Sequence, residues 1–176
     1  MSSSLHEEFL AETLPSLDLV FNLARRMLRR PEDVEDLVQE TYLHAFGAWA
    51  KGRRPRKVEP WIATICLNAG RSWLRRAVAR HEEPEDLDRF EDALASEHVE
   101  EEALGRLRRE MVHRALWRLS EGQRIAIALM DLDGLTAAQV SQVTGWPRGT
   151  VLSRVHRGRK RLAELLERKV GLREEA

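Results

Sequence analysis

Apolar residues recur at helical spacing along most of this chain, and no stretch of any length alternates between apolar and polar positions. The pattern therefore predicts an all-α protein. In the N-terminal half we expect helices over residues 5–28, from Pro31 to about residue 50, and from Pro60 to about residue 79. Pro15 should kink or interrupt the first of them. The predicted inner face of that helix carries Phe9, Leu17, Phe21, Ala24 and Leu28.

The C-terminal half continues the helical periodicity and adds two start signals. One helix is expected over about residues 106–118. Residues 120–123 (SEGQ) and 136–139 (TAAQ) are capping-box patterns, in which the first side chain and the fourth each bond a free backbone N–H at a helix start. The first pattern opens an apolar helix that Gly134 should end, and the second opens a short helix that Gly145 should end.

A further helix should begin at Pro147 and run past Arg161. Two helices joined by a short turn that contains Gly form a helix-turn-helix, whose second helix usually lies in the DNA major groove. At about 100° per residue, one face of this second helix is apolar and the opposite face polar. The apolar face carries Val151, Val155, Gly158, Leu162 and Leu165, and the polar face carries Ser153, His156, Arg157 and Lys160.

Residues 147–161 hold six Arg or Lys and no acidic residue. A basic helix face exposed to solvent is the alternative interpretation. The run begins at a helix-turn-helix turn, however, and its first turn carries the small residues Gly149 and Thr150, which allow close approach to a groove. Because no acid within the run balances the charge, the pattern favours DNA readout.

Charge is unevenly distributed, although the 176-residue chain has 29 basic and 29 acidic residues in total. Residues 81–105 contain 11 acids and one Arg, few apolar residues and Pro84, which is typical of a flexible linker. The flanking segments are both net basic. We therefore predict two small helical domains, 1–80 and 106–176, joined by an acidic flexible linker at 81–105.

The remaining composition argues against several classes of protein. A single Cys, Cys66, sits in an apolar helical run, so a packed thiol is expected rather than a disulfide or zinc site. The six His are scattered without metal-ligand spacing, and no phosphate-binding Gly loop is present. We expect no metal, no cofactor and no enzymatic activity. The chain has no long apolar run and no signal peptide, so a cytoplasmic protein without membrane insertion is expected.

Two sequence blocks resemble the extracytoplasmic-function (ECF) sigma factors, which are small two-domain subunits of bacterial RNA polymerase in the sigma-70 family. PEDVEDLVQETYLHAF (31–46) followed by PWIATICLNAGRSWLRR (60–76) resembles the first conserved domain of that family. LSEGQRIAIALMDLDGLTAAQVSQVTGWPRGTVLSRVHRGRKRL (119–162) resembles the second. The resemblance implies an alternative sigma factor that binds core RNA polymerase and directs transcription initiation at promoter DNA by reading −35 and −10 elements. It also implies control by an anti-sigma factor.

The resemblance assigns roles to residues in the first domain. The segment that docks on the polymerase corresponds to Asp33, Asp36, Gln39 and Glu40. The residues that read the −10 element and stabilise its opened strand correspond to Asn68, Arg71, Ser72, Arg75 and Arg76. Physically, an amide can read a flipped base and guanidinium groups neutralise phosphates. Trp61 is expected in the core, whereas Trp73 could either stack on a base or pack inside.

In the second domain the resemblance implies −35 contacts at Gly149, Thr150, Leu152, Ser153, His156 and Arg157, and the basic run and the polar face add Arg148 and Lys160. Leu152 departs from the family, which commonly has Lys or Arg there, and an apolar side chain cannot bind guanine in a bidentate manner. The loop 51–57 also departs, because five of its seven residues are Lys or Arg, which suggests more phosphate contact and less base capture.

The linker has an implied role as well, that of threading through the polymerase cleft and RNA exit path, with a plain solvated tether as the alternative. Its 25 residues span at most roughly 85 Å. The two promoter elements lie about 25 base pairs apart, which is also roughly 85 Å. Two other functions remain open at this point: a stand-alone helix-turn-helix regulator, which would bind DNA without polymerase, and a nucleic-acid enzyme.

Overall fold

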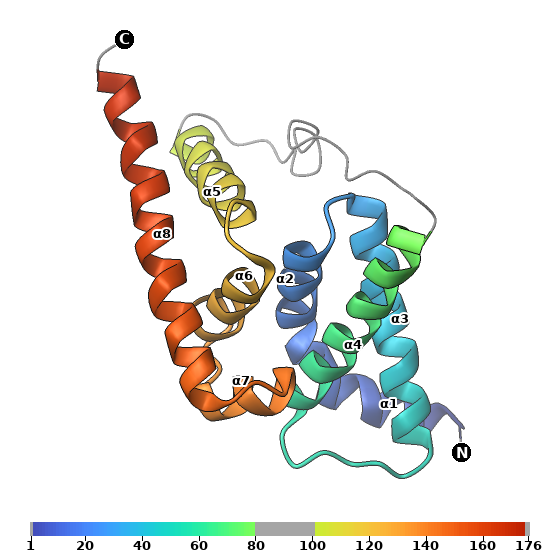
Figure 1. The fold of residues 1–176 in the computed structure, drawn as a ribbon. Coiled ribbons are helices and arrows are strands. Elements are labelled where there is room, and N and C mark those ends of the chain that lie inside the picture. The colour runs from blue at the N-terminus through green and yellow to red at the C-terminus, as the bar shows by residue number, and fades with distance from the viewer. Residues whose placement is uncertain (1, 80–100, 175–176) are drawn as a thin grey trace.

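The computed structural model describes residues 2–79 and 101–174, and every regular element in these ranges is a helix (Figure 1). The all-α prediction is confirmed. The N-terminal part consists of α1 (Ser2–Thr13), the short 3₁₀ turn η1 (Leu14–Ser16), α2 (Leu17–Met27), α3 (Pro31–Ala50) and α4 (Val58–Ala79). The C-terminal part consists of α5 (Glu101–Trp117), α6 (Glu121–Ile127), the π-helical turn η3 (Ala128–Leu132), α7 (Ala137–Thr144) and α8 (Arg148–Glu174).

The first predicted helix is interrupted at Pro15, as expected, but its predicted inner face is partly wrong. Phe9, Ala24 and Leu28 are buried, whereas Leu17 and Phe21 are each 39% exposed. The 3₁₀ turn η1 breaks the helical phase, so α2 does not continue the face of α1. The inner face of α2 is formed instead by Val20, Leu23, Ala24 and Met27.

Helices α2, α3 and α4 pack against one another to form the body of the N-terminal part. Pro31 occupies the first turn of α3, followed by acidic residues where the helix dipole favours them. Leu37 of α3 and Ile62 and Leu67 of α4 are fully buried. Cys66 is buried with them, and burial raises the pKa of its thiol to about 12, as expected for a packed thiol.

Local signals set the elements of the C-terminal part. Both capping boxes form, at Ser120 with Gln123 and at Thr136 with Gln139. Gly134 and Gly145 adopt the left-handed conformation at the two predicted stops, with φ of 69° and 74°. Two features differ from expectation: α5 begins at residue 101, five residues before the predicted 106, and α6 continues as the π-helical turn η3.

The two parts of the chain lie against each other. Helix α7 packs on α4, and α6 and η3 pack on α2 (Figure 1). Buried apolar residues of both parts, such as Leu23 and Val140, belong to one continuous cluster. Residues 80–100, which include most of the predicted linker at 81–105, lie outside the described residues. The last five residues of that predicted linker, 101–105, belong to α5, so the linker prediction is wrong there. The boundaries of the two domains remain predictions.

Candidate nucleic-acid interface

Helix α8 is held by its apolar face, as its angular pattern predicted. Val151, Val155 and Leu165 are buried on this face. Gly158 allows α6 to approach closely, because a Cβ atom there would stand 2.7 Å from Cδ1 of Ile127. The apolar face therefore fixes which side of α8 turns outward.

The residues predicted to contact the −35 element lie on the outward side of α8 or at its start. Six of them are exposed and two, Thr150 and Ser153, are half-buried. The exposed residues are Arg148, Gly149, Leu152, His156, Arg157 and Lys160. The half-buried pair orders part of this face, because Ser153 Oγ donates to the Thr150 carbonyl at 3.1 Å and Arg157 donates to Ser153 Oγ at 3.1 Å.

Partners outside residues 147–161 balance part of the charge, which corrects the expectation that the cations stand alone. Arg159 donates to both carboxylate oxygens of Asp131, from Nε at 2.9 Å. Arg161 pairs with Glu164 at 3.1 Å. The guanidinium of Arg154 lies 3.8 Å from the centre of the Trp146 ring. Arg148, Arg157 and Lys160 are the cations that remain on the outward face.

The residues predicted to contact the −10 element share one face of α4. Asn68, Arg75 and Arg76 are exposed, and Arg71 and Ser72 are half-buried. Arg75 Nη2 donates to Ser72 Oγ at 2.9 Å. Trp61, which was expected in the core, is half-buried against it, and its ring centroid lies 6.2 Å from that of Trp49. Trp73, for which base stacking and packing were both left open, is also half-buried against the core.

The basic loop between α3 and α4 keeps most of its charge on the surface. Lys51, Arg53, Arg56 and Lys57 are exposed. Arg54 behaves differently, because it lies 4.1 Å from the centre of the Trp49 ring and donates to the Trp49 carbonyl and to Glu8. This arginine ties the loop to α1 and α3, although its side chain remains 38% exposed.

A third surface runs along α3, where polymerase docking was predicted. Asp36 and Gln39 are exposed, and Glu40 forms an ion pair with Arg76 at 3.6 Å. Asp33 is half-buried at the same end. Leu43, which the sequence analysis missed, is 71% exposed and lies seven residues after Asp36 on the same stripe. An apolar side chain at the end of an acidic face suits a partner that is both basic and apolar.

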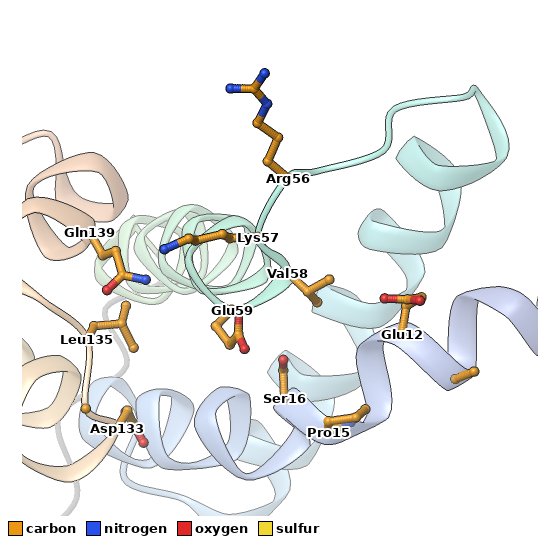
Figure 2. Close-up of a pocket in the computed structure, with 12 residues that line it drawn as sticks. Glu12, Pro15, Ser16, Arg56, Lys57, Val58, Glu59, Asp133, Leu135 and Gln139 are labelled. Carbon is orange, nitrogen blue, oxygen red and sulfur yellow. The ribbon is translucent and has the colours of Figure 1, made fainter.

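A pocket of about 660 Å³ opens where the loop before α4 faces the turn between η3 and α7 (Figure 2). Its lining includes Ser16, Lys57, Glu59, Asp133 and Gln139. Figure 2 shows Lys57 pointing toward Gln139 across the opening. The pocket thus marks the seam between the two halves of the chain, and it carries groups of both charges.

Beside this seam, Arg124 of α6 is only 7% exposed. Its Nε donates to the carbonyl of Arg26 at 2.6 Å and its Nη1 to the carbonyl of Leu119 at 3.2 Å. Its guanidinium lies 4.0 Å from the centre of the Trp117 ring. Burial lowers the pKa of Arg124 to about 10. No sequence pattern points to this residue, because its partner is 98 positions away.

Two further titratable groups are perturbed at the seam. Burial raises the pKa of Asp133 to about 6, and its Oδ1 accepts a hydrogen bond from Asn22 at 3.3 Å. Burial, together with the nearby charges of Arg26 and other arginines, lowers the pKa of His113 to about 4. Both shifts disfavour charge, so the seam holds polar groups in a poorly solvated environment.

Within residues 2–79 and 101–174, no group of three or more His, Cys, Asp or Glu side chains could hold a metal ion. In the same ranges, no helix has both the length and the apolar character needed to cross a membrane.

Two family models match the chain in order. The model of Sigma-70 region 2 matches residues 15–80, and that of Sigma-70, region 4 matches residues 109–162. The chain is 37% identical over 145 residues to the ECF RNA polymerase sigma factor SigM of Mycobacterium tuberculosis, covering 82% of this chain and 69% of that protein. It is 33% identical over 153 residues to the ECF RNA polymerase sigma factor SigE of Mycolicibacterium smegmatis, covering 85% of this chain and 58% of that protein.

Two solved structures share the fold. One is the sigma factor RpoE in complex with the anti-sigma factor NepR from Bartonella quintana, with a TM-score of 0.75, 26% identity, and coverage of 92% of this chain and 98% of that one. The other is CnrH in complex with the cytosolic domain of CnrY, with a TM-score of 0.58, 23% identity, and coverage of 93% and 95%.

Proposed function

Because this chain belongs to the ECF sigma factors of the sigma-70 family, we propose that it is an alternative sigma factor that directs promoter-specific transcription initiation. It binds core RNA polymerase and promoter DNA in the cytoplasm and has no enzymatic activity of its own. The observation that carries the proposal is the order of the two matched regions, 15–80 and 109–162, each of which includes an exposed helix face with the expected residues.

In this proposal the outward face of α8 enters the major groove of the −35 element. Arg148, Arg157 and Lys160 supply the charge, and Gly149 allows the start of the helix to approach the bases. Leu152 is 50% exposed on this face. It contacts thymine methyl groups rather than guanine, so the preferred −35 sequence should contain thymine where the family more often reads guanine.

The face of α4 acts after the strands separate. Asn68 is exposed and carries an amide that can donate to and accept from the edge of an unstacked base. Arg71, Ser72, Arg75 and Arg76 follow the phosphates of the same strand. Capture of unstacked bases then stabilises the open promoter without nucleotide hydrolysis by this chain.

The stripe on α3 docks on the polymerase. Asp33, Asp36, Gln39 and Glu40 provide the polar contacts, and the exposed Leu43 provides an apolar one. An anti-sigma factor is a further proposed partner, supported by the likeness to the sigma factor RpoE, which was solved in complex with the anti-sigma factor NepR.

The test is in vitro transcription with purified core polymerase on genomic DNA fragments, with start sites mapped. Arg157→Ala should weaken recognition of the upstream element, and Asn68→Ala should impair promoter opening, measured by permanganate reactivity, while polymerase binding stays at the level of the unmodified chain. No start site with core polymerase, or tight promoter binding without it, would overturn the proposal in favour of a stand-alone regulator.

A further inference from the structure

The turn between α7 and α8 presents the end of α8 that reads DNA in the proposed function, and Trp146 holds this turn to both helices. Ser141 Oγ of α7 donates to the carbonyl of Trp146 at 2.6 Å, and the N–H of Trp146 donates to Thr144 Oγ1 at 3.2 Å. The ring of Trp146 lies against Arg154, further along α8, whose guanidinium carbon is 3.8 Å from the ring centre. The turn is therefore tied to α7 by hydrogen bonds and to α8 by this stacking contact.

The same guanidinium also packs on the first turn of α6. A Cβ atom at Gly122 would stand 3.0 Å from the guanidinium carbon of Arg154 and 3.1 Å from its Nε and Nη1. Because the carbon is the nearest of the three atoms, Gly122 lies over the flat face of the group rather than at its edge. Arg154 thus fills the space between Trp146 and the start of α6, and joins three elements that lie together at one end of α8 (Figure 1).

The charge of Arg154 is not turned toward DNA. The side chain is half-buried, and its Nη1 is buried without a hydrogen-bond partner among the described residues. Burial of this donor carries a desolvation cost, which stacking of the cation on the face of Trp146 offsets. A lysine would carry the same charge, but its ammonium is compact, strongly hydrated and has no flat face. The site therefore uses the shape of the guanidinium as well as its charge.

We infer that Arg154 is a positioning residue for readout of the −35 element, because it sets the place of the first turn of α8 relative to α6 and α7. The inference rests on the proposed function. Base contacts of a helix-turn-helix come from the start of its second helix, which here carries Gly149 and Leu152. Contacts to base edges carry the sequence information and need precise placement, whereas phosphate contacts carry none. Loss of the stacking contact should therefore reduce discrimination between bases.

The first experiment compares Arg154→Lys with the unmodified full-length chain. The probe is a DNA duplex from a promoter whose start site has been mapped with the unmodified chain and core polymerase, and a set of duplexes with single-base changes in its upstream element. Fluorescence anisotropy gives a Kd for each duplex, and the ratio of changed to parent Kd measures discrimination. A specific base contact accounts for roughly 5-fold or more in this ratio. Arg154→Lys should lose that factor at the bases nearest the start of α8, although the charge is kept.

The ratio separates positioning from a loss of folded protein, because a smaller folded fraction weakens binding to every duplex by the same factor. Arg161→Lys is the matched control, since it makes the same exchange on α8 at a residue that pairs with Glu164. Its ratios should equal those of the unmodified chain. Unchanged ratios for Arg154→Lys would overturn the inference.

Trp146→Leu tests the stacking contact from its uncharged side. A tryptophan cannot neutralise a phosphate, so a loss of discrimination in this variant supports positioning. The double variant Arg154→Lys/Trp146→Leu should lose no more than the larger of the two single effects, because both changes break one contact. Additive losses would show that the two side chains act separately and would overturn the inference.

The mapping of start sites keeps the two proposals apart. If the unmodified chain directs no start site with core polymerase, the proposed function fails and the inference falls with it. A mapped start site combined with unchanged ratios in Arg154→Lys refutes the positioning role alone.

Discussion

The ion pair between Arg159 and Asp131 sets how many cations α8 can offer to DNA. Arg159 donates to both carboxylate oxygens, and its side chain is 61% exposed at the edge of the outward face. Asp131→Asn keeps the shape of the side chain and removes the charge that holds the guanidinium. Because the pair is exposed, its loss should change folding stability little. The released Arg159 can then neutralise a phosphate.

The expected magnitude follows from counterion release. Each additional phosphate contact steepens the dependence of log K on log[salt] by about 0.9. Between 50 and 200 mM salt, the affinity of Asp131→Asn for a −35 duplex should therefore fall roughly 3.5-fold more than that of the unmodified protein. Fluorescence anisotropy of a labelled duplex at several salt concentrations measures this slope directly, and thermal melting checks that stability is preserved.

Glu35→Gln is the matched control, because it changes net charge equally at an exposed position of α3, remote from α8. Its slope should equal that of the unmodified chain. If Asp131→Asn shows an unchanged slope, Arg159 does not reach a phosphate. An equal increase in both variants would instead show that total charge, rather than this ion pair, sets the slope.

Three further changes probe packing, titration and readout. Gly158→Ala places a Cβ 2.7 Å from Cδ1 of Ile127 and should lower the free energy of unfolding in urea by about 1–2 kcal/mol, the overpacking cost less the gain in helix propensity. Ile127→Val should relieve this in a double-mutant cycle, and additive effects would contradict the contact. Burial raises the pKa of Asp133 to about 6, so the contribution of this carboxyl to stability is lost as pH rises from about 4 to 6. The pKa of His113 is lowered to about 4, so the contribution of this imidazole to stability is gained as pH rises from about 4 to 6.5. Chemical unfolding of Asp133→Asn should thus show stability rising with pH relative to the unmodified chain, by roughly 1–2 kcal/mol after allowing for partial exposure, and parallel pH profiles would refute the shift. Leu152→Arg should strengthen binding to duplexes with guanine at the base it faces by about 1–3 kcal/mol in anisotropy titrations, and an equal gain on every base would indicate phosphate contact instead.

Features that depend on neighbouring residues could be predicted from the sequence. Ser120 and Thr136 form capping boxes because each residue and its partner lie within one helical turn. Gly145 ends α7 because a glycine can adopt the left-handed backbone conformation without help from a distant residue. The apolar face of α8 was predicted for the same reason, since a regular helix of this length keeps its phase. Where the phase is broken, at the 3₁₀ turn before α2, the same method placed Leu17 and Phe21 on the wrong side.

Long-range partners determine which of the predicted charges are available, and no local pattern encodes them. Asp131 pairs with Arg159 across 28 residues and Asp133 reaches Asn22 across 111, yet the two acids are only two positions apart. In a strand, residues at this spacing would share a face, whereas in an α-helix, at about 100° per residue, they would lie about 160° apart. The π-helical turn η3 leads out of α6 at this point, so one acid faces α8 and the other faces α2. A charge count over residues 147–161 therefore predicts a DNA-binding helix, but only the fold shows that Asp131 at this turn holds Arg159 of that helix, while Asp133 accepts a hydrogen bond from Asn22 of α2.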